Sequence, residues 1–139
     1  MRPSMWTSYL IEWQPEEMVR EFASHGWHTC ELSDEHAHDL LKRGDPARVG
    51  AEFRAFAADH GMSFPQGHFY LCTKGFRPED QVGRQAADIA PPDDAAWEEA
   101  LAAMRRWVDL FSALGVEAGV LHLGGGRLAQ AGWSPERVF

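Results

Sequence analysis

The stretch "LFSALGVEAGVLHLGGG", Leu110 to Gly126, decides the fold, because it takes the chain from the end of a helix into a strand. The apolar periodicity of the helix stops at Gly115, and glycine commonly ends helices because it tolerates a left-handed backbone. Residues 116–123 then form a short apolar run, which is typical of a strand. One imidazole, His122, stands near the end of that run, and three glycines follow. We therefore expect a β/α unit, with His122 and Gly124 as candidate functional residues where the strand ends.

Four segments before this strand carry the signals of helices. Three of them begin with a capping side chain or a proline in the first turn, and all four end at a glycine. The expected helices lie within residues 12–26, 33–44, 44–61 and 93–115. The last of them has apolar side chains at steps of four and three, which predicts one buried face formed by Trp97, Leu101, Met104, Val108 and Phe111.

Short apolar runs separate these helices and read as strands. They cover residues 5–11, 27–32, 62–71 and 116–123. Strands and helices therefore alternate along the chain, which implies parallel strands joined by crossover helices. We find no linker and expect one α/β domain over residues 1–139.

Polar residues gather at the C-terminal ends of the strands, which is typical of a (β/α) barrel of the TIM type. We expect one side of the third strand to carry Phe64, Gln66, His68 and Tyr70. Because a full barrel needs eight strands and ~250 residues, the chain would form a partial barrel of about four strands with their helices. The long connection from Cys72 to Asp94 is expected to form a lid over the site.

The composition excludes several classes of partner. The formal net charge is −8 and the sequence pI is near 5.3, which argues against a nucleic-acid-binding surface. The apolar stretch within residues 1–13 is too short and too polar for a signal peptide or a membrane span. We therefore expect a cytoplasmic protein with no membrane partner. In that reducing compartment Cys30 and Cys72 are expected to be free thiols, with a disulfide as the alternative.

Polar side chains near the strand ends are candidates for a site. Glu31 ends the second expected strand, and His68 and His122 lie near the ends of the next two. A carboxylate can accept hydrogen bonds from substrate hydroxyls, and a neutral imidazole can bind a metal or transfer a proton near pH 7. Each histidine can equally be a structural residue bonded to a neighbouring carbonyl. Trp6 and Tyr9 could line an apolar substrate wall or fill the core.

The stretch from His28 to His38 gathers side chains through which a zinc site could be drawn, namely His28, Cys30, Glu31, His36 and His38. Its spacing matches no compact zinc pattern, because no second pair of ligands follows. We therefore interpret His28 and Cys30 as core positions. Glu31 is expected at the mouth of the barrel, and His36 and His38 are expected to be solvated on a helix start.

The segments "GWHTCELSDEH", "FPQGHFYL" and "LFSALGVEAGVLHLGG" together resemble the N-terminal half of the xylose-isomerase-like barrel superfamily. That group contains sugar isomerases and epimerases and the related endonuclease IV enzymes. The resemblance covers essentially the whole chain, and its motifs indicate the superfamily better than the substrate. It implies an enzyme that uses a divalent metal, manganese, magnesium, cobalt or zinc, bound at the C-terminal ends of the strands.

For the sugar branch, the resemblance implies aldose–ketose isomerisation or ketose epimerisation of a sugar or sugar phosphate. Glu31, His68, His122 and Gly124 would contact the substrate. The metal ligands of that branch come from four later strands. We therefore expect this chain to be a truncated form that ends at the start of its fourth barrel helix, lacks the metal site and is inactive alone.

Two alternatives stay open. In the endonuclease IV branch two histidines of the first half bind zinc, and the resemblance gives that role to His68 and His122. A non-catalytic half barrel is the other alternative. It would expose two sheet edges and its inner face, which favours a homo-oligomer.

Overall fold

The computed structural model describes residues 3–69 and 94–121, apart from the side chains of Asp94 and Ala96. Strands and helices alternate along these residues. The strands are β1 (Met5–Trp6), β2 (Thr29–Leu32), β3 (Ser63–Phe69) and β4 (Ala118–Leu121). The helices are the 3-10 helix η1 (Thr7–Leu10) and the α-helices α1 (Pro15–Ser24), α2 (Asp34–Leu41), α3 (Pro46–Asp59) and α4 (Asp94–Leu114).

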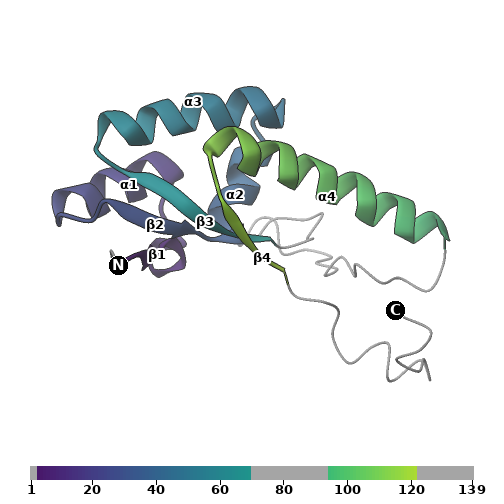
Figure 1. The fold of residues 1–139 in the computed structure, drawn as a ribbon, viewed down its shortest axis with the longest axis horizontal. Helices are drawn as coiled ribbons and strands as arrows, with labels where there is room; N and C mark the ends of the chain where they lie inside the picture. Colours follow the sequence, from purple (N-terminus) through teal and green to yellow (C-terminus); the bar gives the residue numbers. More distant parts are fainter. Residues whose placement is uncertain (1–2, 70–93, 122–139) are drawn as a thin grey trace, which may run out of the picture.

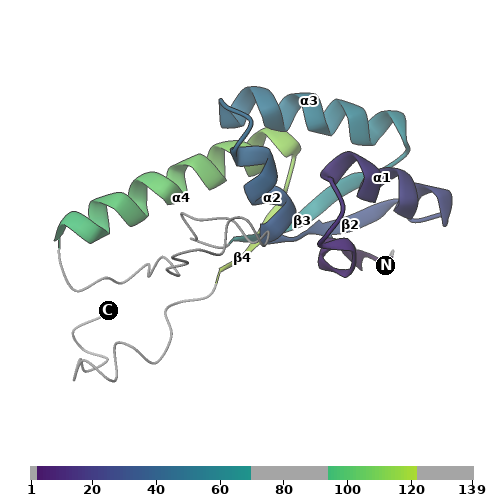
Figure 2. The same ribbon diagram turned by 180° about the vertical axis from the view of Figure 1, so that it is seen from behind.

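The strands form one parallel sheet in the order β1-β2-β3-β4. Helices α1, α3 and α4 lie together over one face of this sheet, as both views show (Figures 1 and 2). Each strand thus pairs with the next strand of the chain, and the connecting helices return on the same side. The expected α/β class and the parallel sheet are confirmed.

The helix boundaries follow the capping signals of the sequence. Ser33 Oγ accepts a hydrogen bond from a backbone N–H in the first turn of α2, and Asp45 caps α3 in the same way. Pro15 and Pro46 occupy first-turn positions, where a missing N–H costs nothing. Positive φ angles follow the ends of the helices, at Gly26, Gly44, Gly61 and Gly115.

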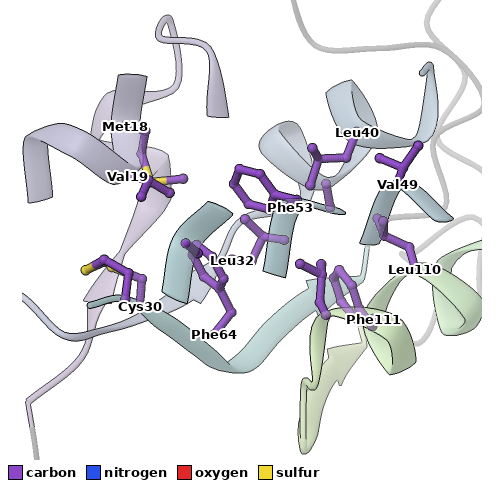
Figure 3. Packing of buried hydrophobic residues seen from close by; sticks show 14 of the residues in the cluster. Met18, Val19, Cys30, Leu32, Leu40, Val49, Phe53, Phe64, Leu110 and Phe111 are labelled. Carbon is purple, nitrogen blue, oxygen red and sulfur yellow. The ribbon is translucent and has the colours of Figure 1, made fainter. Parts of the chain in front are cut away.

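One apolar core fills the space between the helices and the sheet (Figure 3). The sheet contributes Cys30 and Leu32 from β2 and Phe64 from β3, each at most 2% exposed. Helices α3 and α4 approach closely at Gly50, where an added Cβ would lie 2.7 Å from the carbonyl oxygen of Leu110. The absence of a side chain at this position therefore sets the spacing of the two helices.

Strand β3 contains one more residue than β2 over the same length. Thr29 pairs with Ser63, whereas Glu31 pairs with Gln66, so two steps along β2 match three along β3. This is a β-bulge, which reverses the side on which the following residues lie. Pro65 lies within the bulged stretch, and a bulge tolerates a proline because the ladder is already interrupted there.

The bulge corrects our expectation about the sides of β3. Phe64 is buried among the helices, and its ring stacks on that of Phe53 with centroids 5.6 Å apart. His68 lies on the opposite face of the sheet, beside Glu31. The prediction that Phe64 and His68 share a side was therefore wrong. Tyr70, the last member of that set, lies outside the described residues.

Helix α4 is rotated relative to the face that its periodicity predicts. Its buried residues are Ala100, Trp107, Leu110, Phe111 and Leu114. Of the predicted stripe only Phe111 is buried, while Trp97 and Val108 are 46% and 49% exposed. The prediction was wrong because α4 carries two apolar faces, and the face with the large Trp107 is the one that packs on the rest of the domain.

The first expected strand is much shorter than residues 5–11. After Trp6 the chain turns into η1. Thr7 is buried at this turn, and its hydroxyl oxygen accepts a hydrogen bond from the Ser33 backbone N–H at 2.7 Å. The interpretation that Trp6 and Tyr9 fill the core was also wrong, since these side chains are 43% and 76% exposed.

Candidate functional site

Three side chains meet near the C-terminal ends of β1, β2 and β3, on the sheet face opposite the helices. Glu31 Oε1 lies 3.3 Å from His68 Nδ1. The Trp6 ring lies next to the His68 ring, with centroids 6.3 Å apart and planes tilted by 31°. The structure therefore brings together Glu31 and His68, two of the residues expected at the site, and adds Trp6.

The parallel register places these side chains. Trp6 pairs with Glu31 across β1 and β2, and the bulge in β3 brings His68 to the same face. Val120 pairs with His68 on the β4 side. At Gly67, an added Cβ would lie 2.5 Å from the ring of Phe111 in α4, so only glycine lets β3 approach the helix at this point.

The Glu31–His68 pair is partly shielded from solvent. The side chain of Glu31 is 23% exposed and that of His68 is 18% exposed. A carboxylate beside the ring nitrogen fixes the orientation of an imidazole and favours a proton on Nδ1, which leaves Nε2 as an acceptor. The pair can therefore bind hydroxyl groups of a ligand, with accepting oxygens on Glu31 and a ring nitrogen on His68.

The other expected site residues cannot be placed. His122 and Gly124 follow β4 and lie outside the described residues, as does the expected lid up to residue 93. Whether the two histidines share one pocket therefore stays a prediction.

The described side chains do not by themselves fit a catalytic metal. No cluster of three or more His, Cys, Asp or Glu side chains suited to a metal occurs in residues 3–69 and 94–121. Glu31 and His68 provide two donors, whereas catalytic sites for such ions usually have three protein ligands. We therefore derive no chemical step through a metal.

Three histidines differ from their expected roles. His28, expected in the core, is exposed, and its Nδ1 lies 3.3 Å from the Gly61 carbonyl oxygen. His36 and His38, expected in solvent, are 0% and 9% exposed. The signal for His36 was its place three residues after the capping Ser33, where the ring can reach back to the cap.

Cys30 is a buried free thiol, as expected. Burial raises the pKa of this thiol to about 12, so it stays protonated and unreactive at neutral pH. Cys72 lies outside the described residues.

No family model and no curated protein matches the sequence. Among the described residues, no helix combines the length and the apolar character that crossing a membrane requires.

Proposed function

We propose that this chain forms the N-terminal half of a (β/α) barrel of the sugar isomerase and epimerase type, and that Glu31, His68 and Trp6 contact the sugar. The Glu31–His68 pair at the ends of adjacent parallel strands is the observation that carries the proposal. Barrel enzymes bind substrates at this edge of the sheet. The sequential strand order and the helices on one face also support a barrel.

The three side chains suit a sugar because it presents two kinds of surface. Hydroxyl groups can donate to the carboxylate of Glu31, and the ring nitrogen of His68 can bond to a neighbouring hydroxyl. The C–H groups of the sugar can lie on the exposed face of Trp6, whose ring contributes apolar contact area next to the polar pair. The substrate on this proposal is a neutral sugar or a sugar phosphate.

A divalent metal, as in the superfamily that the sequence resembles, would polarise the carbonyl of the substrate. The remaining metal ligands would have to come from outside the described residues. The alternative of an abasic-site endonuclease needs His122 beside His68, and the net charge of −8 opposes contact with DNA phosphates.

Ligand binding by the chain itself tests the proposal. We expect saturation-transfer NMR to detect millimolar to micromolar binding of at least one aldose, ketose or sugar phosphate. The variants Glu31→Gln and His68→Gln should each weaken this binding by about tenfold, because each loses one hydrogen bond to the ligand. Glu31→Gln loses the bond to the charged carboxylate, and His68→Gln loses the bond to the oriented imidazole. Circular dichroism should show both variants folded.

Glu52→Gln is the matched control, because Glu52 lies on the exposed side of α3 and pairs with Arg48. This variant should bind the sugar as the parent does. Absence of binding to any sugar in the panel, or equal binding by the parent and by both site variants, would contradict the proposal.

A further inference from the structure

Helix α4 has a second apolar face that its own domain buries only in part. The ends of this face, Trp97 and Val108, are 46% and 49% exposed. Leu101 and Met104 between them are half-buried, and Met104 also packs against the core. We call these four residues the outer stripe of α4. Figures 1 and 2 both show the N-terminal part of α4 extending beyond the other helices.

The spacing of the outer stripe is that of a helix–helix seam. Its members follow one another at steps of four, three and four residues, the pattern that packs two helices side by side. The pattern is also symmetric about the point between Leu101 and Met104. In an antiparallel pair of α4 helices related by a two-fold axis at this point, Leu101 faces Met104, and the large Trp97 faces the small Val108.

The charges beside the stripe fit the same arrangement. Glu98 and Arg105 flank the stripe on one side, seven residues apart. Neither forms an ion pair within the described residues. In the antiparallel pair Glu98 of one protomer lies near Arg105 of its partner, at both ends of the contact. In a parallel pair this flank of one helix lies on the opposite side of the seam from the same flank of its partner, so Glu98 and Arg105 of the two protomers would not meet. The neighbouring Arg106 is not expected to replace Arg105 as the partner of Glu98, because Arg106 donates a hydrogen bond to the Leu41 carbonyl oxygen at 3.1 Å.

We propose that the outer stripe of α4 binds a second copy of this chain, with the two α4 helices antiparallel. This goes beyond the proposed function, because the surface lies on the helix layer and not at the Glu31–His68 pair. A seam of four layers is smaller than the ~1,200–2,000 Å² that stable interfaces bury, so we expect a reversible dimer that dissociates in the micromolar range.

Sedimentation velocity from about 1 µM to about 1 mM tests the dimer. We expect Val108→Glu to raise the dissociation constant of the dimer at least about tenfold, because two charges would enter the seam. Ala102→Glu is the control, since Ala102 is exposed on α4 outside the stripe and its change should leave the dimer intact. Thermal melting should show both variants as stable as the parent at low protein concentration.

A charge exchange tests the antiparallel direction. Glu98→Arg and Arg105→Glu should each weaken the dimer, and the double variant should restore it, because each contact then regains opposite charges. A chain that stays monomeric at the highest concentration overturns the proposal, as does a dimer that Val108→Glu leaves unchanged. A strong loss of stability in monomeric Val108→Glu also overturns it, since the stripe would then be covered by other residues of the same chain.

Discussion

At the scale of single residues, His36 connects the start of α2 to the turn that follows β1. Its Nδ1 lies 3.0 Å from Ser33 Oγ and 3.2 Å from Thr7 Oγ1, and its Nε2 lies 3.1 Å from the Leu10 carbonyl oxygen. A carbonyl can only accept, so Nε2 carries the proton and donates to Leu10. Nδ1 then accepts a hydrogen bond from a hydroxyl group. The ring is fully buried, so these bonds replace its contacts with water.

Removing this ring should destabilise the protein. We expect His36→Ala to lower the free energy of unfolding by ~1–3 kcal/mol, because the Leu10 carbonyl and the Thr7 hydroxyl lose a partner in the interior. Urea unfolding followed by circular dichroism measures the change. His25→Ala is the control, since the side chain of His25 is 66% exposed. Equal stability of the two variants would show that the network around His36 contributes nothing.

The sequence allowed only part of the site to be predicted at this scale. Glu31 and His68 were found because strand ends are where polar residues of parallel sheets meet ligands. The buried His36 was missed, because its polar partners lie in η1 and on the Ser33 cap. A position among helix-start residues looks solvated until the tertiary contact that covers it is known.

At the scale of elements, an ion pair joins α1 to the turn after α2. Arg43 contacts the carboxylate of Glu16 through both terminal nitrogens, with Nη2 3.0 Å from Oε2. The Arg43 hydrogen bond is the main reason why the pKa of the Glu16 carboxyl lies below its ordinary value near 4.5. Because the folded state lowers this pKa, the pair adds stability above pH ~4.5 and loses it as the pH falls through the folded-state value.

The variant Glu16→Gln should therefore be less stable than the parent near pH 7 and equally stable once the pH lies below the folded-state pKa of Glu16, where the parent carboxyl is protonated in both states. The difference should be small, because both side chains are about one third exposed and water screens the charges. Thermal melting across this pH range measures it. Glu99 is exposed on α4, so Glu99→Gln should be as stable as the parent at every pH. If the stability lost in Glu16→Gln did not change with pH, the ion pair would be ruled out as the cause of the loss.

Elements were predictable wherever local chemistry decides them. The caps, prolines and glycines gave the helices closely, because they act within a turn of the chain. The bulge in β3 was not foreseen, since the register depends on how β2 pairs with it. The rotation of α4 was missed for a similar reason. Periodicity shows where the apolar faces of α4 lie, but the helix has two of them. Which face is buried depends on how α4 packs against the neighbouring α3.

At the scale of the whole molecule, one core connects the described elements. Met18 and Leu110 belong to the same buried cluster, although Met18 lies in α1 and Leu110 in α4, the first and the last of the described α-helices. Both side chains are 0% exposed, and residues from β2, β3 and α3 lie between them (Figure 3). A continuous core of this kind predicts that distant elements unfold together.

The variant Met18→Ala tests this cooperativity, because it leaves a cavity in α1 and should cost ~2–5 kcal/mol. Hydrogen exchange measured by mass spectrometry reports the opening free energy of each segment. If the core unfolds as one unit, the buried C-terminal part of α4, residues 107–114, should lose as much protection as α1 does. The N-terminal part of α4 carries the exposed end of the outer stripe and should exchange early in the parent and the variant alike. Loss of protection confined to α1 would instead divide the domain into separate folding units, and the pairing of α3 with α4 would then hold without α1.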